Sequence, residues 1–428
     1  MADYHRKYFG LKKEVMPVLE ATYASKLVDL LRLKGYHISR GDLTVRLAKE
    51  FGFCVGVERA VQMAYETRRK FPDKRIFITT EIIHNAFVNK QLVEMGLIFL
   101  NGQYATGMTY ADITKDDVVI LPAFGAAVKE IETIKHTGAF IVDATCCAVV
   151  TVWNNVHKYA KDRFTSVIHG KYSHEETIAT ASRATGAADG FTGKHVADNG
   201  RFLIVRDLEE ARMVCDYIEG KGNREVFLKQ FAKAVSEGFD PEKDLECVGV
   251  ANQTTMLSSE TLAIQGMLRG TFVKKHGEEE TRQRFRSIDT ICSATQDRQD
   301  AIVQMMDQRP DVMIVIGGYN SSNTTHLAEM GIEKGVPSYH IDDASCMLSK
   351  SQIRHQPIGK HEQVIAENWW PNKRPLTIGV TAGASTPNNK IGDVFLRLFE
   401  LSGANVDDLL VEMDALPVVE KEEAPDHH

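Results

Sequence analysis

The chain has 428 residues, a formal net charge of -7 and a hydrophobic fraction of 43%. This length allows two to four domains, and the acidic balance argues against a general nucleic-acid-binding protein, which usually carries a basic excess. No run approaches the roughly 18 apolar residues of a membrane span, and residues 1–15 lack the apolar core of a secretion signal. We therefore expect a cytoplasmic protein that binds neither nucleic acid nor membranes.

The first 42 residues predict an N-terminal helical extension, because hydrophobic residues recur there at helical spacing: Val15, Leu19, Tyr23, Leu27 and Leu31. From Leu43 onward, strand-like runs alternate with helical stretches, which is typical of parallel α/β layers. The strand-like runs are Leu43–Leu47, Arg75–Thr79, Asp117–Leu121, Ala139–Val142, Thr165–Ile168, Phe202–Val205, Leu245–Ala251, Asp311–Ile316 and Leu376–Val380.

The alternation repeats often enough for three small α/β domains, which we place at residues 43–145, 146–290 and 291–415. A helix is expected at the end of the third domain. The last segment, 416–428, is charged and contains proline, so we expect it to be disordered.

Seven cysteines occur in the chain. In the cytosol thiols stay reduced, so cysteines there are better candidates for metal binding or catalysis than for disulfides. A single cytosolic cysteine is usually a small buried hydrophobic residue. We favour that interpretation for Cys215, Cys247 and Cys346, because none of them lies in a chemical motif.

The other candidates are Cys54, Cys146 and Cys292, which each lie at a predicted strand-to-helix junction, one in each domain. Ligands of open parallel sheets bind at the carboxyl ends of the strands, and the free N–H groups of a helix N-terminus favour a thiolate. The pattern is unlike a zinc site, because it lacks a Cys-x-x-Cys pair. Spacing alone is a weak signal and favours unrelated cysteines over a shared metal site.

Polar motifs also follow predicted strands. The segment Asn320–Asn323 suits a phosphate or, equally simply, a helix cap, and Ser385 follows another strand with similar chemistry. His84 and His174 are candidates for binding or proton transfer, although a surface or satisfied buried histidine is commoner. Near His174, Glu176 can supply protons. Thr254 closes another strand, and the convergence of these groups on strand ends favours one site over separate capping roles.

The motifs GFCVGVERA, EIIHN, DATC, HGKYSHEET, NQTT, TIC-SAT, NSSN and GVTAGAS occur in this order. From about Leu43 to about Pro387 the chain resembles the 4-hydroxy-3-methylbut-2-enyl diphosphate reductase (IspH/LytB) family, in the longer form of plants and cyanobacteria. The resemblance implies three small parallel α/β domains arranged around a central iron–sulfur cluster. It also implies reductive dehydroxylation of that diphosphate to isopentenyl and dimethylallyl diphosphate, the last step of the non-mevalonate isoprenoid pathway.

Carried over by motif, the resemblance implies one 4Fe-4S cluster with three cysteine ligands and one open iron; the ligands are Cys54, Cys146 and Cys292. It implies Glu176 as the proton donor, helped by Thr254 and His174. The implied substrate-binding residues are His84, His174, Thr254, Ser321, Ser322, Asn323 and Ser385. The implied electron donor is reduced ferredoxin or flavodoxin, and a homodimer formed through the N-terminal extension is a further hypothesis.

Two places depart from the family pattern. Phe124 stands where short bacterial members have a histidine, and Cys147 and Thr151 stand where the family usually has a proline and a lysine. We hypothesise that Cys147 is not a metal ligand. Three alternatives stay open on the residues alone: an iron–sulfur hydro-lyase, a non-catalytic iron–sulfur sensor and a structural zinc protein.

Overall fold

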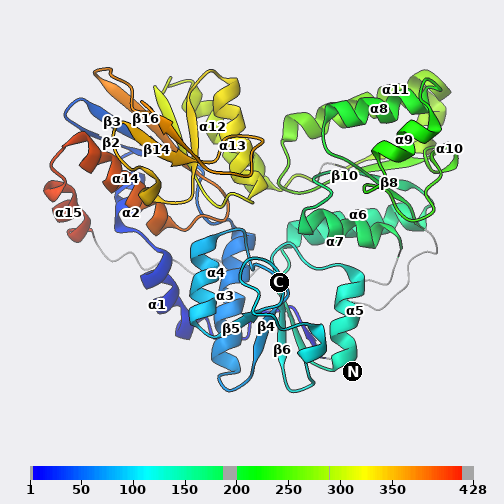
Figure 1. Cartoon of the computed structure of the whole chain (residues 1–428), viewed down its shortest axis with the longest axis horizontal. Coiled ribbons are helices and arrows are strands. Elements are labelled where there is room, and N and C mark those ends of the chain that lie inside the picture. Colours follow the sequence, from blue (N-terminus) through cyan, green and yellow to red (C-terminus); the bar gives the residue numbers. More distant parts are fainter. Residues whose placement is uncertain (1–2, 187–199, 289, 417–428) are drawn as a thin grey trace.

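The computed structural model describes residues 3–186, 200–288 and 290–416, so the predicted disordered tail lies almost entirely outside the described residues. Within them, three sheets covered by helices form three lobes (Figure 1). The predicted α/β class with parallel sheets is confirmed. Among the described residues, no helix combines the length and the apolarity that a membrane crossing requires.

The first lobe contains a five-stranded parallel sheet, which lies at the bottom of Figure 1. Its strands in spatial order are β1 (Tyr4–His5), β7 (Phe140–Asp143), β6 (Val118–Leu121), β4 (Ile76–Ile78) and β5 (Leu97–Phe99). Its helices are α1 (Lys12–Tyr23), α3 (Val55–Lys70), α4 (Ala86–Glu94) and α5 (Val128–Thr137). Alternate residues of β6 pack on opposite faces: Val118 belongs to the core under α3, and Val119 to the core under α5. Helices on both faces explain why β4, β5 and β6 consist of apolar residues only.

The second lobe contains a four-stranded parallel sheet. Its strands in spatial order are β11 (Phe285–Ser287), β10 (Val248–Asn252), β8 (Thr165–His169) and β9 (Phe202–Val205). Its helices are α6 (Cys147–Lys161), α7 (Glu175–Ala184), α8 (Leu208–Ile218), α9 (Arg224–Gln230), α10 (Pro241–Asp244) and α11 (Ser258–Arg284). The backbone of α11 is interrupted at Gly277, whose φ of 78° lies in the left-handed region that glycine tolerates.

The third lobe contains a five-stranded sheet in which only β2 is antiparallel to its neighbour. Its strands in spatial order are β13 (Ser338–Ile341), β12 (Val312–Ile316), β16 (Leu376–Ala382), β3 (Leu43–Leu47) and β2 (His37–Arg40). A hairpin of β14 (Gln352–His355) and β15 (Val364–Glu367) lies beside it. Its helices are α2 (Lys26–Leu33), α12 (Ser293–Met306), α13 (Ser322–Glu333), α14 (Asn388–Ser402) and α15 (Asp407–Asp414).

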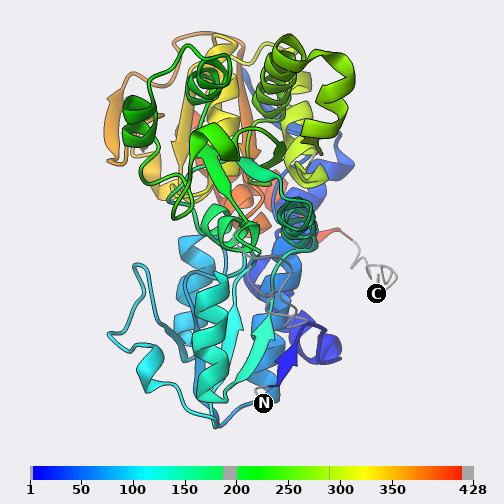
Figure 2. The same ribbon diagram turned by 90° about the vertical axis from the view of Figure 1, so that its right-hand side faces the viewer.

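The sheets divide the N-terminal part of the chain differently from the expected boundaries. Strand β3, expected to open the first domain, pairs with β16 in the third lobe. The expected extension is also shared, because β1 pairs with β7 in the first lobe (Figure 2), whereas α2 packs in the core of the third. Hydrophobic periodicity identifies a strand, but it carries no information about which distant strand will be its neighbour.

The N-terminal extension packs against the first and third lobes of the same chain. Leu27 and Leu31 of α2 are almost fully buried in the core of the third lobe, and burying each leucine side chain contributes about 1.5–3 kcal/mol. Val15 and Tyr23 of α1 are buried in the core of the first lobe. The extension therefore ties two lobes together within one chain.

Candidate active site

The three candidate metal ligands occupy equivalent positions. Cys54, Cys146 and Cys292 are the N-cap residues of α3, α6 and α12. The predicted position directly before a helix is therefore confirmed for each of them. At these positions the thiols lie beside free backbone N–H groups and the positive end of a helix dipole, both of which favour a negatively charged sulfur.

The backbone N–H of each cysteine is hydrogen-bonded to a neighbouring loop. In all three cases the cysteine N–H donates a hydrogen bond to a carbonyl oxygen: Cys54 to Ala384 (3.1 Å), Cys146 to Ala123 (2.8 Å) and Cys292 to Thr254 (3.5 Å). Two of these bonds lead to the GVTAGAS and NQTT motifs. The sulfur positions are thus coupled to the loops that bear the polar candidates.

The sulfurs of Cys54 and Cys146 border one small space. A Cβ at Gly56 would collide with Sγ of Cys146 and lie in ordinary contact, 4.0 Å, with Sγ of Cys54, so the position of the Cys146 sulfur requires a glycine here. Burial raises the pKa of Cys292, and negative charge on Cys54 and Glu176 raises it further. The third thiol therefore lies within electrostatic reach of the same centre.

The spacing of the thiols distinguishes between a single ion and a cluster. Within the described chain, His84, His174 and Glu175 form the one group of three potential ligands whose atoms all lie within 4.8 Å of one another. The three sulfurs do not form such a group, so at least one pair of them lies farther apart than this. Because zinc binds thiolate at about 2.3 Å, two of its sulfur ligands lie at most about 4.6 Å apart. The trio therefore does not fit one zinc ion, whereas a polynuclear iron–sulfur core allows each cysteine its own metal.

A buried carboxyl group lies beside this centre. Glu176, in the first turn of α7, is 3% exposed. Its Oε1 accepts a hydrogen bond from the backbone N–H of Thr254 (2.6 Å), and its Oε2 pairs with the Thr254 hydroxyl (2.9 Å). Burial raises the pKa of Glu176 to about 7 in spite of these bonds. Such a carboxyl can hold and release a proton near neutral pH.

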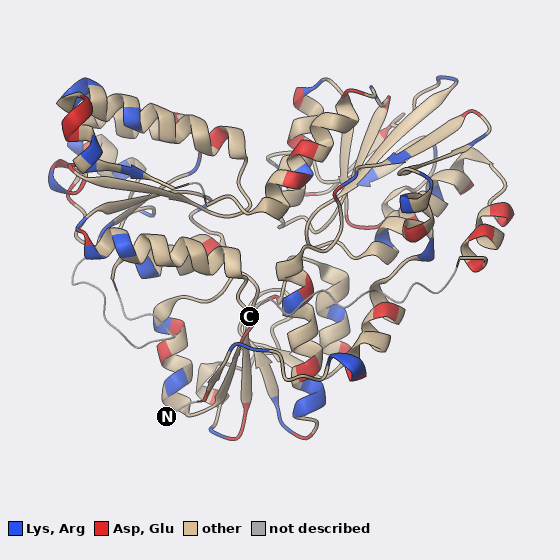
Figure 3. Cartoon of the chain, turned by 180° about the vertical axis from the view of Figure 1, so that it is seen from behind, with Lys and Arg blue, Asp and Glu red and all other residues tan. Residues whose placement is uncertain are grey.

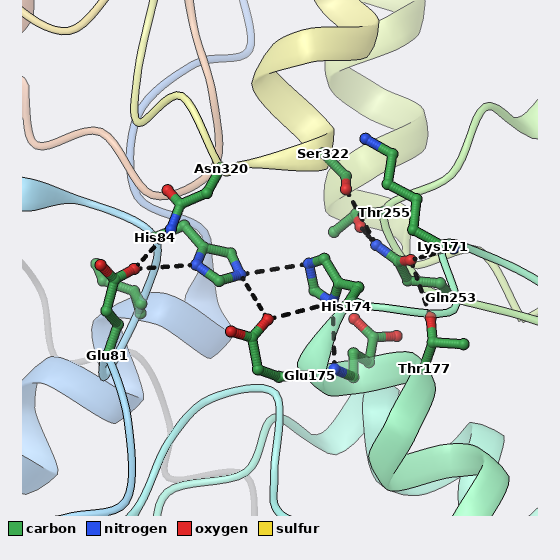
Figure 4. Close-up of polar contacts among 12 residues, drawn as sticks. Glu81, His84, Lys171, His174, Glu175, Thr177, Gln253, Thr255, Asn320 and Ser322 are labelled. Carbon is green, nitrogen blue, oxygen red and sulfur yellow. Dashed lines mark hydrogen bonds and ion pairs between the residues drawn. The ribbon is translucent and has the colours of Figure 1, made fainter. Parts of the chain in front are cut away.

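The two candidate histidines meet across two lobes (Figure 4). His174 is the N-cap of α7, and its Nδ1 accepts a hydrogen bond from the backbone N–H of Glu176 (3.1 Å). Its Nε2 lies 3.3 Å from Nε2 of His84, which follows β4 in the first lobe. Burial lowers the pKa of His174 well below its usual range, and the positive charge of Lys171 adds to this. His174 is therefore a neutral imidazole.

Phe124 supports this pair. Its ring stacks on that of His84, with centroids 4.7 Å apart and planes inclined by 14°. The residue that departs from the short bacterial pattern therefore orients an imidazole.

The third lobe supplies the hydroxyl and amide candidates. Ser321 is the N-cap of α13, and the Ser322 hydroxyl accepts a hydrogen bond from Gln253 Nε2 (3.2 Å). The Ser385 hydroxyl donates to the His84 carbonyl (3.0 Å). Asn323 is 2% exposed and its Oδ1 accepts from the Ala384 N–H (3.0 Å), yet its Nδ2 has no partner among the described residues. A buried donor without an acceptor is costly, so this amide is available to donate a hydrogen bond to a bound ligand.

Charged side chains of both signs are interspersed over the outer helices of all three lobes (Figure 3). By contrast, the candidate anion-binding groups of the three lobes are imidazoles, hydroxyls and amides. Such groups bind phosphate oxygens through directed hydrogen bonds.

Two carboxylates of the site were not predicted from the sequence. Glu81 Oε2 lies 3.2 Å from His84 Nδ1 and accepts a hydrogen bond from Asn320 Nδ2 (2.8 Å). Glu175 Oε2 lies 3.7 Å from His84 Nε2. The spacing of three residues between Glu81 and His84 could have indicated that the carboxylate contacts the imidazole. Glu175 gave none, because acidic residues are common in the first turn of any helix.

The four other cysteines lie outside the trio, and all seven in the chain are free thiols. Cys215 and Cys346 are buried, as predicted, whereas Cys247 is only partly buried. Cys147 is exposed and is the first residue of α6, one position past the N-cap.

Comparison with known proteins agrees with the motifs. Residues 45–399 match the family described as LytB protein. A 4-hydroxy-3-methylbut-2-enyl diphosphate reductase of Thermosynechococcus vestitus is 50% identical over 400 residues, which cover 93% of this chain and 95% of that protein. One from Gloeobacter violaceus is 48% identical over 404 residues, covering 94% and 93%.

Among solved structures, the E-1-hydroxy-2-methyl-but-2-enyl-4-diphosphate reductase from Plasmodium falciparum has the same fold, with a TM-score of 0.58 and 22% identity. The match covers 85% of this chain and 88% of that one. The family match spans most of the sequence, and the chain therefore belongs to the LytB family.

Proposed function

We propose that this chain reduces 4-hydroxy-3-methylbut-2-enyl diphosphate to isopentenyl and dimethylallyl diphosphate, as the last step of the non-mevalonate isoprenoid pathway. The observation that carries the proposal is one juxtaposition. In a chain of the LytB family, the sulfurs of two helix-capping cysteines, Cys54 and Cys146, border one space, and a third, Cys292, lies within electrostatic reach of Cys54 and of the buried carboxyl group of Glu176, whose pKa is about 7.

Cys54, Cys146 and Cys292 would hold one 4Fe-4S cluster, leaving one iron without a protein ligand. When bound, the cluster supplies single electrons and a Lewis-acidic iron for the substrate hydroxyl. Two observations support this fit: at least one pair of sulfurs is too widely spaced to share one ion, and Gly56 leaves room for the Cys146 sulfur beside that of Cys54.

The diphosphate end of the substrate would bind to His84, His174, Ser321, Ser322, Asn323 and Ser385. The orphan amide Nδ2 of Asn323 supports this assignment, because a phosphate oxygen gives it an acceptor. His84, His174 and Asn323 come from three different lobes. A single substrate therefore contacts all three lobes and holds them closed, which excludes water from the reacting end.

The reaction takes up two electrons and two protons, breaks one C–O bond, forms one C–H bond and releases water. Glu176 would provide the proton that lets the hydroxyl leave as water, since its raised pKa keeps it protonated up to about pH 7. Thr254 holds the carboxyl group through its N–H and hydroxyl. His174 fixes the same turn through its bond to the Glu176 N–H.

A reductase needs an electron donor, and we propose reduced ferredoxin or flavodoxin for this role. We also propose the cytoplasm as the compartment, because reduced thiols are required to bind the cluster.

Anaerobic purification followed by metal analysis and turnover assays tests the proposal. We expect iron and sulfide in the protein, and formation of both diphosphate products only when a reduced donor is present. Release of water from the substrate without any donor would instead indicate a hydro-lyase. Intact iron–sulfur absorption with neither turnover nor substrate binding would indicate a sensor, and zinc in place of iron would overturn the cluster assignment.

A further inference from the structure

His84 lies between two carboxylates that approach opposite edges of its ring (Figure 4). On one edge, Glu81 Oε2 lies 3.2 Å from Nδ1, and Glu81 is 6% exposed. On the other edge, Glu175 Oε2 lies 3.7 Å from Nε2, and its side chain is 41% exposed. The buried carboxylate thus faces away from the anion-binding groups, and the exposed one faces toward them.

When both imidazoles are neutral, the hydrogen bonds fix the positions of their protons in the substrate-free site. His174 Nδ1 accepts a hydrogen bond from the Glu176 N–H, so a neutral His174 carries its proton on Nε2. That proton points at His84 Nε2, 3.3 Å away, which must accept it. The proton of His84 is therefore on Nδ1, facing Glu81. The two Nε2 atoms share a single proton.

A diphosphate changes this requirement, because its ionised oxygens only accept hydrogen bonds. Both Nε2 atoms must then donate, and His84 has no proton there. It can pass its Nδ1 proton to Glu81 and take one at Nε2, or it can gain a second proton and become an imidazolium.

Glu81 does not take that proton readily. Burial alone would raise its pKa, but hydrogen bonds from His84, Asn320 and Gln103 outweigh burial and hold the pKa of Glu81 below its usual value. Phe124 adds to this preference, because a cation stacked on an aromatic face is stabilised. The imidazolium is therefore the favoured donor.

We propose that Glu81 is a positioning residue that couples substrate binding to proton uptake: the diphosphate binds together with one proton, which His84 receives at Nε2 and Glu81 balances at Nδ1. The inference rests on the proposed function, because it uses the diphosphate site.

The other titratable groups around His84 are His174, Glu175 and Glu176 on the side of α7, with Lys171 beside His174. Glu175 is expected to weaken diphosphate binding, whereas Glu81 strengthens it, because the Glu175 carboxylate competes with the diphosphate for the same edge of His84.

Titration calorimetry of the anaerobic, cluster-loaded protein with inorganic pyrophosphate tests the proposal. Repeating the titration in buffers of different ionisation enthalpy gives the net number of protons taken up on binding. We expect the wild-type protein to take up one proton more than Glu81→Gln, and the variant to bind pyrophosphate about tenfold or more weakly. The titration of pyrophosphate itself cancels in this difference.

Glu175→Gln is the matched control, because it removes the same charge from the other edge of the same ring. Simple charge repulsion predicts tighter pyrophosphate binding for both variants. The proposal predicts tighter binding for Glu175→Gln with an unchanged proton number, and weaker binding for Glu81→Gln. Equal proton numbers for wild type and Glu81→Gln, or tighter binding by Glu81→Gln, would overturn it.

His84→Gln extends the test in case Glu81→Gln does not load its cluster. A glutamine amide donates to the anion without titrating, so this variant should bind pyrophosphate and lose the extra proton; retention of that proton would overturn the proposal. A wild-type protein that does not bind pyrophosphate would instead overturn the diphosphate site and the proposed function with it.

Discussion

The sulfur side of this site, with Cys54, Cys146 and Cys292, and its proposed diphosphate side, with His84, His174 and Asn323, are built in different ways. On the sulfur side, the backbone positions each cysteine as a helix N-cap, and the Cys292 sulfur has one close hydroxyl, that of Thr295 at 3.0 Å. On the diphosphate side, side chains hold one another across lobe boundaries, as His84 and His174 do. The sulfur side therefore depends on helix starts, whereas the diphosphate side depends on a network in which each group affects its neighbours.

Removing one thiol is the strongest test of the sulfur side. Cys292→Ser should lose its cluster and its turnover completely, while the polypeptide stays folded, because serine is a favourable N-cap residue. Iron content, turnover and circular dichroism of the variant measure the three effects. Retained iron together with wild-type turnover would contradict the assignment.

Glu176→Gln tests the acid that lies between the two sides. A glutamine still offers an oxygen to the Thr254 N–H, so cluster and substrate should bind as before. The proton is lost, and general acid catalysis contributes about 10²–10⁴-fold, so kcat should fall by about that factor. Undiminished turnover in a steady-state assay would remove Glu176 from the proton role.

The wild-type enzyme should show the same group in its pH profile. The pKa of Glu176 is raised to about 7, so its proton is present below this pH and is lost above it. Because this pKa belongs to the substrate-free protein, we expect kcat/KM to be nearly constant below about pH 7 and to fall about tenfold per pH unit above it. The residual activity of Glu176→Gln should not decline in this way above pH 7. A decline of equal size in the variant would show that another group causes it.

Asn323→Asp tests the diphosphate side with a smaller effect. Aspartate keeps the oxygen that accepts from the Ala384 N–H and replaces the orphan Nδ2 donor by an acceptor. Loss of a hydrogen bond to a charged partner costs about 1.5–3 kcal/mol, so kcat/KM should fall by about one to two orders of magnitude. Asn154→Asp, on the exposed face of α6, adds the same charge elsewhere and should leave kcat/KM unchanged. An unchanged kcat/KM for Asn323→Asp would remove this amide from the diphosphate site.

The sequence predicts the sulfur side better than the diphosphate side. A cysteine before a helix is a local pattern, so the positions of Cys54, Cys146 and Cys292 could be inferred one at a time. The pairing of distant strands has no comparable local signal in the sequence. For this reason β3 was expected in the first lobe, although it pairs with β16 in the third. Glu81 acquires its role only from the imidazole, Asn320 and Gln103 that surround it in space.

The smallest change in iron content is expected for Cys147→Ser. This variant tests whether a cysteine must be a helix N-cap residue to bind the metal. Cys147 adjoins a proposed ligand, but it is the first helical residue of α6 and is exposed. If the N-cap position decides which thiols bind metal, Cys147→Ser should contain as much iron per chain as the wild type, and Cys146→Ser should lose it. A substantial loss of iron from Cys147→Ser would show that closeness to the centre, and not the N-cap geometry, selects the ligands.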